Sequence, residues 1–381
     1  MSVMKKKRIA FQVAHNRAHH YHIARVVDEL LSSRYQDKIE VMLIYINDED
    51  LYHLKDLLVN KDGAFEFKVN MYKLRCFDFE CVKRWFRQQI NNIFFPYRNF
   101  VDYQFVILNI YDFIYECDSI VLTDLIHGSC VKKYAPNTKV VWAQHGPVIN
   151  KRYINSCDLS DVDIIWSPGE ITTESFRNAR RVVNVGSLKL DWVKEFSKRE
   201  KSTLFNNGNL TAIYNPHFNV MAGGESWKEL GIELLSWFSK RSELNLIFAP
   251  HPRLKDYFNL NTVDKFRAFP NIYIDLETKN LSNLYYESKS DIYIGDISSQ
   301  VFEYIYIKPR PLFFFKSKNS GEDIKAMQSL GVEFSSVTNL FHSIGKEFPQ
   351  EKIEQQSEFI NSVFYRLSES PVHIAINSLL K

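Results

Sequence analysis

The sequence predicts an α/β protein with two doubly wound, Rossmann-like domains that face each other across a cleft. The chain has 381 residues, which is too long for one ordinary hydrophobic core and suits two domains. Short apolar segments alternate with amphipathic helical ones, and the alternation starts again after a polar, charged segment at 193–209. We therefore expect domains at 1–195 and 205–350, followed by a helical tail at 351–381 that can pack back on the first domain.

The first domain is expected to contain the first run of this alternation. Residues 21–31 are expected to form a helix because their apolar side chains recur at a spacing of three or four, and a second helix is expected at 49–59. Strands separated by helices of this length form parallel sheets with right-handed crossovers. The expected strands are 7–13, 39–46, 119–123, 139–143, 163–166 and 181–185.

The second domain repeats the pattern. Its expected helices are 227–238, 281–287 and 300–307, and the tail is expected to form one or two more. The expected strands are 210–214, 244–249, 271–275, 291–295 and 311–315. Ligands of such sheets bind beyond the carboxyl ends of the strands, so we expect the functional residues just after strands. This architecture is typical of many nucleotide-sugar transferases.

Composition and charge narrow the classes of function. A net charge of +3 gives no global sign of nucleic-acid binding. No window approaches about 18 uninterrupted apolar residues, so we expect no membrane-spanning helix. The basic start at 1–8 lacks the apolar region of a signal peptide. Five cysteines without CxxC spacing are typical of free thiols in a reducing compartment, which predicts a cytoplasmic protein.

The strongest functional signal follows one of the strands of the second domain. Strand 291–295 is followed by a turn with Asp296, Ser298 and Ser299, which leads into a helix. The two serines stand where N-cap hydroxyls belong. The N–H groups and dipole of such a helix start attract anions, so the hydroxyls beside them suit a pyrophosphate. A plain capped helix would show the same pattern.

A second signal follows strand 244–249. Two prolines stiffen the turn, and His251 and Arg253 follow at the carboxyl end of the strand. Arginine offers a fork of donors to phosphate, and a protonated or N–H-donating histidine suits a departing phosphate. The alternative is a rigid turn with an exposed arginine.

The first domain contributes a third signal after strand 139–143. Gly146 permits a close approach of a ligand or an unusual backbone angle. His145 stands where an acceptor hydroxyl would meet it, and its ordinary pKa near 6.5 suits a general base. A core or capping histidine is the alternative.

Further strand ends are expected to line the cleft. Asn215 and His217 follow strand 210–214, and Asp191 closes a segment that starts at Gly186. Four histidines between 15 and 22 lie near the first strand, but no HExxH spacing or cysteine accompanies them, so the sequence predicts no metal site. They are candidates for contact with an acceptor instead.

A segment from Lys83 to Phe100 alternates basic and aromatic residues. An interfacial helix that docks on anionic lipid has this composition, so a membrane surface is a candidate partner. An amphipathic helix packed in the first domain has it too.

Taken in order, these motifs resemble those of the teichoic-acid-type CDP-glycerol (polyol phosphate) glycerophosphotransferases. The resemblance covers roughly residues 120–320. The matching pieces are Gln144-His145-Gly146, Gly186 to Asp191, Tyr214-Asn215-Pro216, His251-Pro252, Asp296-Ile297-Ser298-Ser299 with Glu303, and Lys308-Pro309.

The resemblance implies a GT-B-like fold and a transferase that needs no cofactor. It implies that His145 acts as the base, that His251 engages the donor phosphates, and that the loop from Asp296 to Ser299 with Glu303 binds the CDP moiety. Arg253 joins this set by its position alone. The implied partners are a CDP- or CMP-activated donor and a glycan or lipid-linked acceptor, with no nucleic acid. The implied location is the cytoplasm or the inner face of a bacterial cell membrane.

The chain also departs from the family pattern. It has Tyr-Asn-Pro-His at 214–217 where members commonly have Tyr-Ala-Pro-Thr, and Glu303 where they often have aspartate. Residues 1–100 carry no likeness that identifies the acceptor. A GT-B glycosyltransferase that uses CMP-Kdo, CMP-sialic acid or a UDP-sugar remains an alternative, as do a UDP-sugar epimerase and a non-catalytic nucleotide- or glycan-binding protein.

Overall fold

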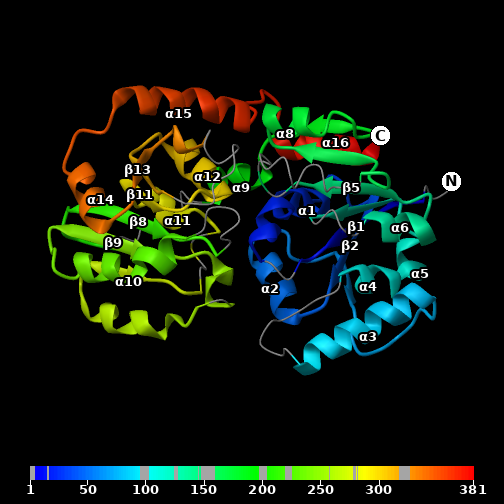
Figure 1. Ribbon diagram of the computed structural model, residues 1–381. Coiled ribbons are helices and arrows are strands. Elements are labelled where there is room, and N and C mark those ends of the chain that lie inside the picture. Colours follow the sequence, from blue (N-terminus) through cyan, green and yellow to red (C-terminus); the bar gives the residue numbers. More distant parts are fainter. Residues whose placement is uncertain are drawn as a thin grey trace. The chain divides into compact units, whose positions relative to one another are not determined.

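The computed structural model describes residues 5–14, 17–94, 103–123, 128–144, 146, 159–196, 204–218, 225–256, 258–277, 280, 282–316 and 327–381. The chain divides into two compact units. Unit 1 combines Met1–Trp192 with Val363–Lys381, and unit 2 is Val193–Ser362. Each unit has its own parallel sheet with helices interleaved along the chain (Figure 1).

In unit 1, the strand order is β3-β2-β1-β4-β5-β6-β7 and every pair is parallel. The strands are β1 (Lys7–Gln12), β2 (Ile39–Tyr45), β3 (Phe65–Lys68), β4 (Ser119–Leu122), β5 (Lys139–Ala143), β6 (Ile164–Ser167) and β7 (Val182–Asn184). The helices are η1 (Arg17–His22), α1 (Ala24–Leu31), α2 (Asp48–Asp56), α3 (Phe79–Phe94), α4 (Tyr103–Leu108), α5 (Tyr111–Ile114), α6 (Gly128–Tyr134), α8 (Glu170–Ser175), α9 (Leu188–Phe196, which runs on into unit 2) and α16 (Pro371–Leu380).

In unit 2, the order is β10-β9-β8-β11-β12-β13, again parallel throughout. The strands are β8 (Leu210–Asn215), β9 (Leu244–Phe248), β10 (Ile272–Ile274), β11 (Ile292–Gly295), β12 (Leu312–Phe315) and β13 (Val332–Phe334). The helices are α10 (Ser226–Phe238), η6 (Pro252–Asp256), η7 (Leu260–Ala268), α11 (Tyr285–Ser288), α12 (Ser299–Ile307), α14 (Val337–Ile344) and α15 (Gln350–Val363).

Both sheets share one topological feature. The chain fills each sheet from its first strand outward in one direction, then returns to the other side of that strand. The switch points therefore lie between β1 and β4 in unit 1 and between β8 and β11 in unit 2. In doubly wound sheets, ligands bind at the carboxyl ends of the strands at such a switch point.

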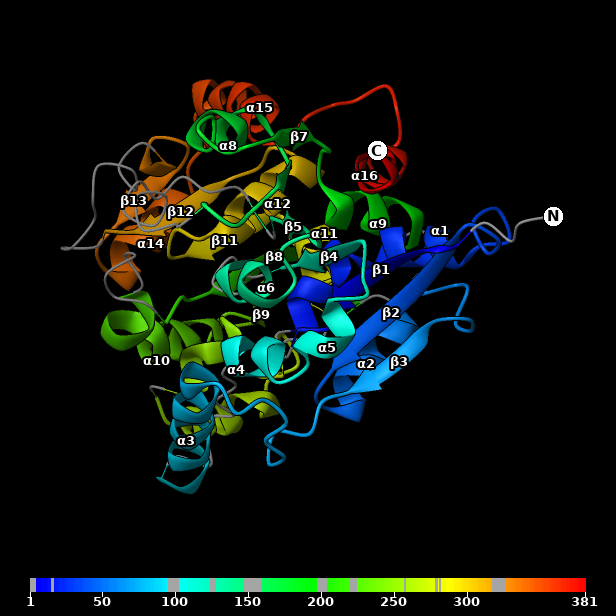
Figure 2. The same cartoon turned by 90° about the vertical axis from the view of Figure 1, so that its right-hand side faces the viewer.

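The end of the chain belongs to unit 1. Helix α16 packs against α1 (Figure 2). The Trp166 indole donates a hydrogen bond to the Ser378 hydroxyl at 2.8 Å. At Gly169 the returning chain comes so close that a Cβ would lie 1.8 Å from the Val363 carbonyl oxygen. Only glycine permits this approach, so the segment after Val363 is held where it meets β6.

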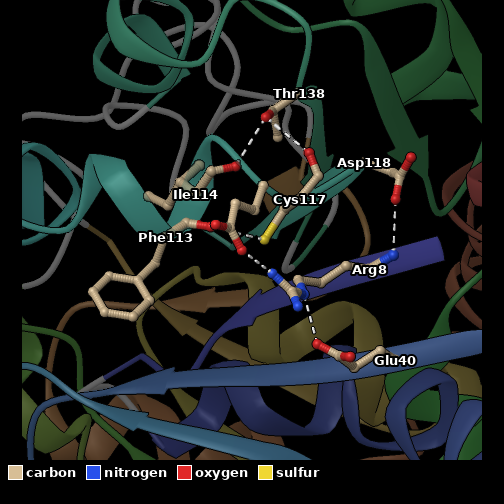
Figure 3. A network of polar contacts seen from close by, with 8 residues as sticks. Arg8, Glu40, Phe113, Ile114, Cys117, Asp118 and Thr138 are labelled. Carbon is tan, nitrogen blue, oxygen red and sulfur yellow. Dashed lines mark hydrogen bonds and ion pairs between the residues drawn. The ribbon is translucent and has the colours of Figure 1, made fainter. Parts of the chain in front are cut away.

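An ion-pair network fixes the amino-terminal edge of the unit 1 sheet (Figure 3). The Arg8 guanidinium pairs with Glu40 and Glu116 at 2.5 Å each, and its backbone N–H donates to Asp118 at 2.8 Å. These partners come from β2 and from the turn before β4, so the network joins three neighbouring segments. It lies at the opposite edge from the strand ends where the sequence predicts functional residues.

Helices α4 to α6 lie against one face of the unit 1 sheet (Figure 2). Phe105 and Ile107 are buried there in a core cluster with strand residues such as Ile120. Unit 2 has a separate core in which Phe238 of α10 and Phe248 of β9 have no exposed surface. Burial of apolar side chains on this scale is the dominant stabilising contribution to each unit.

The sequence predicted most strands to within a residue or two at each end, but it missed β3 and β13. Both are short edge strands, and the residues of β3 are largely exposed, so they lack a buried apolar pattern. The helix expected at 281–287 is reduced to α11. Leu284 has a left-handed backbone with φ of 61°, which begins the helix one residue later.

Candidate functional site

The predicted donor-binding residues of unit 2 lie at the carboxyl ends of three adjacent strands. Asn215 ends β8, His251 follows β9, and Asp296 follows β11. Because β8 lies between β9 and β11, these ends lie side by side at one edge of the sheet. The switch point between β8 and β11 lies within this group.

Asp296 holds the loop after β8 in place. Its side chain has no exposed surface, and its carboxylate accepts the backbone N–H of His217 at 2.8 Å. It also accepts the Ser226 hydroxyl at 2.7 Å and the backbone N–H groups of Ser226 at 3.0 Å and Glu225 at 3.3 Å. Burial raises the pKa of this carboxyl from 3.8 to about 6, against the opposing effect of these hydrogen bonds. The sequence predicted that Asp296 contacts the donor, but its carboxylate is occupied by the protein.

The tautomer of His251 is set by its neighbours. Its Nδ1 accepts the backbone N–H of Arg253 at 3.1 Å, so the ring proton of the neutral form is on Nε2. Burial, together with the nearby His217 and Arg253, lowers the pKa of His251 from 6.5 to about 3. At neutral pH the ring is therefore uncharged and offers one N–H donor. Of the two forms that the sequence left open, the structure favours the N–H-donating one.

An aromatic cluster surrounds this histidine. The rings of His217 and His251 meet edge to face with centroids 4.7 Å apart, and the Phe218 ring lies 4.6 Å from that of His251. The Arg253 guanidinium lies over the Phe218 ring at 4.5 Å, within the range of a cation–π contact. Phe218 thus supports the exposed guanidinium of Arg253. Sequence reasoning missed Phe218, although it directly follows the Pro-His turn.

The turn after β11 is shaped by Gly295. This residue has φ of +151°, and a Cβ on it would lie 2.7 Å from the Asn215 carbonyl oxygen. The Tyr293 hydroxyl of β11 donates to the Asp296 backbone carbonyl at 2.9 Å and thereby stabilises the turn. As a result, the chain reaches the start of α12 by a backbone path that only glycine takes without strain.

Ser298 is the N-cap residue of α12, as the sequence predicted. Its backbone is extended, but its hydroxyl makes no capping hydrogen bond. The first N–H groups of a helix have no partners within the helix, so they remain the groups that an anion would meet. The side chain of Ser299, the first helical residue, lies outside the described part of the structure.

Two other predicted residues of unit 2 are buried. The Asn215 amide donates to the Ala249 carbonyl at 2.6 Å, so it joins the ends of β8 and β9. Glu303 lies on α12 with 8% of its surface exposed and interacts with neighbouring groups. A second buried acid, Glu287 of α11, accepts the Gln300 amide at 2.6 Å near the start of α12. No sequence motif pointed to Glu287.

The predicted residues of unit 1 are described less completely. His145 lies outside the described residues, and Gly146 is half-buried after β5. Asp191 lies on α9, where its carboxylate is 3.7 Å from the Arg25 guanidinium. This contact ties α9 to α1 within unit 1.

The histidines after β1 contact protein groups. His19 Nδ1 lies 3.3 Å from the Thr123 hydroxyl. The His20 ring is held by the Ala14 carbonyl at 2.7 Å and by His53 at 2.9 Å, and burial lowers its pKa to about 4. Within the described ranges, no group of three or more His, Cys, Asp or Glu residues is arranged to hold a metal ion.

Comparison with known proteins places this architecture among two-domain α/β folds of the GT-B type. The wall teichoic acid polymerase TagF is 17% identical, with a TM-score of 0.59 over 100% of this chain and 91% of that one. A UDP-GlcNAc 2-epimerase from Neisseria meningitidis, bound to UDP-GlcNAc, is 15% identical, with a TM-score of 0.60 over 99% and 100%. MurG from Acinetobacter baumannii is 10% identical, with a TM-score of 0.50 over 98% and 99%. At these identities the likeness shows a shared fold.

Comparison of the sequence alone identifies no family for this chain. No family model matches the chain, and no curated protein matches it. In the described part of the chain, no helix is both long enough and apolar enough to cross a membrane.

Proposed function

We propose that the protein transfers a polyol phosphate, of the glycerol phosphate type, from a CDP-activated donor to a hydroxyl group of a cell-surface glycan or a lipid-linked acceptor. The observation that carries this proposal is the neutral, tautomer-fixed His251 beside Arg253, at the same sheet edge as the start of α12. This arrangement gives unit 2 a set of hydrogen-bond donors suited to the phosphates of a nucleotide donor.

The chemistry of these groups fits a departing nucleotide. The Nε2–H of His251, the Arg253 guanidinium and the first N–H groups of α12 are all donors, and the Asp296 carboxylate at this edge accepts hydrogen bonds from the protein. Adjacent strands lie about 4.8 Å apart, so the ends of β9 and β11 are separated by about 10 Å. One nucleotide can bridge this span, and the donors would stabilise the negative charge that develops on CMP.

The proposed transfer is an in-line displacement. The acceptor hydroxyl oxygen bonds to the phosphorus that carries the polyol, the bond from this phosphorus to the bridging oxygen breaks, and CMP leaves with the electron pair. A base takes the hydroxyl proton, and we assign this role to His145 from its sequence motif. Replacing His145 with alanine is then expected to slow turnover by about 10²- to 10⁴-fold with little effect on donor affinity.

The remaining donor-side residues have supporting roles in this proposal. Asp296 positions the loop with His217 and the start of α10, while Asn215 and Gly295 fix the strand ends beside it. Ser298, Ser299 and Glu303 stay assigned to the donor through the α12 start. We place the acceptor in unit 1, beside Gly146 and the neighbouring strand ends.

A UDP-sugar enzyme is the second candidate. It is favoured by the similar fold of the UDP-GlcNAc 2-epimerase that binds UDP-GlcNAc. Incubation with CDP-glycerol, CDP-ribitol, CMP-Kdo and UDP-GlcNAc, each with and without lipid-linked or glycan acceptors, separates the candidates. CMP release from a CDP-polyol that depends on the acceptor supports the transferase. Loss or epimerisation of UDP-GlcNAc would favour the UDP-sugar enzyme over the transferase. Tight binding without turnover would indicate a non-catalytic binder.

The outer face of α3 supports a membrane-associated location for this reaction. Cys81 and Gln88 point inward and are buried, whereas Phe79, Phe86 and Ile90 are 82%, 56% and 52% exposed. The exposed apolar residues recur at helical spacing and continue to Ile93 and Phe94, which are 72% and 67% exposed.

Basic residues lie on the same face of this helix. Lys83 and Arg87 are exposed between the apolar positions. An apolar stripe flanked by cations is the pattern of a helix that lies in the interface of an anionic membrane. We propose that α3 holds the protein at such a surface, where a lipid-linked acceptor would be found.

A further inference from the structure

The two sheets end their first strands in the same way. β1 and β8 are both six residues long, both lie at the switch point of their sheet, and both end in a residue with an amide side chain. These residues are Gln12 in unit 1 and Asn215 in unit 2. The two amides therefore occupy corresponding places in the two units.

The two amides differ in their hydrogen bonding. In unit 2 the Asn215 amide nitrogen donates to the Ala249 carbonyl at 2.6 Å, and its oxygen lies 3.4 Å from the Tyr293 hydroxyl. In unit 1 the nitrogen and the oxygen of Gln12 are both buried, and neither has a hydrogen-bond partner among the described residues. Only 4% of the Gln12 surface is exposed.

An unpartnered buried amide is unusual in a folded protein. Buried polar groups are nearly always hydrogen-bonded, and the exceptions require an explanation such as a ligand. Gln356 shows the usual state: its amide nitrogen donates to the carbonyls of Arg310 and Leu330, and its oxygen accepts the Arg310 N–H at 3.0 Å. Gln12 is also buried, but it has none of these contacts among the described residues.

The place of Gln12 in the fold is where a ligand is expected. It is the last residue of β1, it is in register with Ile44 of β2, and β1 and β4 form the switch point of the sheet. Buried polar residues also follow the next two strands along this edge, Thr123 after β4 and Gln144 after β5. Buried polar side chains therefore lie at the ends of three neighbouring strands on the carboxyl edge of the unit 1 sheet.

We infer that Gln12 is a ligand-binding residue and that it recognises a neutral hydroxyl-bearing group, such as the diol of a polyol or sugar. An amide offers both N–H donors and a carbonyl acceptor. A hydroxyl pair can satisfy both, whereas a fully ionised phosphate group can accept only from the N–H group and would leave the carbonyl unpartnered. This inference deepens the proposed function, because it makes Gln12 a residue that selects the acceptor.

The test uses Gln12→Met, which keeps the size of the side chain and removes its polar atoms. Because the amide has no partner among the described residues, we expect the variant to unfold at the same or a higher temperature. The matched control is Gln356→Met, which removes a fully bonded buried amide and is expected to lower the melting temperature.

Binding is measured without any nucleotide, so the result does not depend on the donor side. The side-chain amide signal of Gln12 is identified in protein labelled with ¹⁵N-glutamine as the signal that Gln12→Met lacks. We expect it to shift when glycerol, ribitol or N-acetylglucosamine is added, and we expect the variant to bind the active compound about tenfold more weakly.

Three results would overturn the inference. The first is an amide signal that none of the three compounds moves. The second is an equal shift with inorganic phosphate, which would indicate an anion site. The third is a loss of stability in Gln12→Met as large as that in Gln356→Met, which would show that the amide has a structural partner. A failure of CDP-glycerol turnover alone would leave these measurements unaffected and would count against the proposed function instead.

Discussion

His251 provides the most direct test of the proposed phosphate site. Replacing it with alanine removes the Nε2–H donor but leaves β9 and both prolines of the turn in place. A hydrogen bond from a neutral donor to a charged phosphate contributes about 1.5–3 kcal/mol. Since about 1.4 kcal/mol corresponds to a factor of ten, we expect CMP and CDP-glycerol to bind about 10- to 150-fold more weakly.

The structure also predicts how this contribution depends on pH. Burial lowers the pKa of His251 to about 3, so its ring stays neutral from pH 5 to 8 and its contribution to CMP binding should be constant over that range. For folding, a histidine with a lowered pKa adds stability that is fully present above pH 6.5. This stability is lost as the pH falls from 6.5 toward 3, because the unfolded chain then binds the proton more readily.

Calorimetric titration of CMP into the wild-type protein and His251→Ala measures both effects. The matched control is His342→Ala, an exposed histidine of α14 in the same unit, which should bind CMP like the wild type. An affinity in His251→Ala within twofold of the wild type would refute the assignment. So would a wild-type affinity that rises below pH 6.5 and loses that rise in the variant, because His251 would then act as a cation.

Three other predictions follow from the same structure. Asp296→Asn should have a lower free energy of unfolding than the wild type. This difference should shrink by about 3 kcal/mol as the pH rises from 4 to above 6, because the pKa of the buried carboxyl is raised to about 6 and its ionisation destabilises the folded wild type. Urea unfolding at several pH values measures this gap, and a gap that does not change with pH would count against it. Gly295→Ala should lose about 1–3 kcal/mol of stability and weaken CMP binding, because its φ is +151° and the new Cβ would meet a carbonyl oxygen at 2.7 Å. The double change Phe86→Ser and Ile90→Ser should abolish sedimentation with anionic vesicles and leave the melting temperature unchanged, whereas Ile232→Ser, an exposed position on α10, should not affect binding. Equal sedimentation of all three proteins would exclude α3 as the membrane contact.

Local pattern was sufficient for much of the fold. Alternating apolar strands and amphipathic helices predicted two parallel sheets, because a strand buried on both faces must be a continuous apolar run. It also located the functional residues after strands, where the carboxyl ends meet. Edge strands such as β3 were missed because one face is exposed and the apolar run disappears.

The chemical state of each side chain was decided by tertiary contacts. The sequence grouped His251, Arg253 and Asp296, but only the fold shows that Asp296 is turned inward and that His251 is a neutral donor. These properties depend on burial and on partners that are far away in the chain, so no local motif encodes them.

The two amides at the switch points also show the difference between what local sequence encodes and what tertiary contacts decide. The sequence contains a glutamine at position 12 and an asparagine at 215, and nothing near either residue separates them in function. Strand pairing places both at equivalent positions, but only the three-dimensional surroundings provide partners for Asn215 and leave Gln12 without any among the described residues. Sequence thus determined where strands end, whereas packing determined which of those ends has hydrogen-bonding capacity left for a ligand.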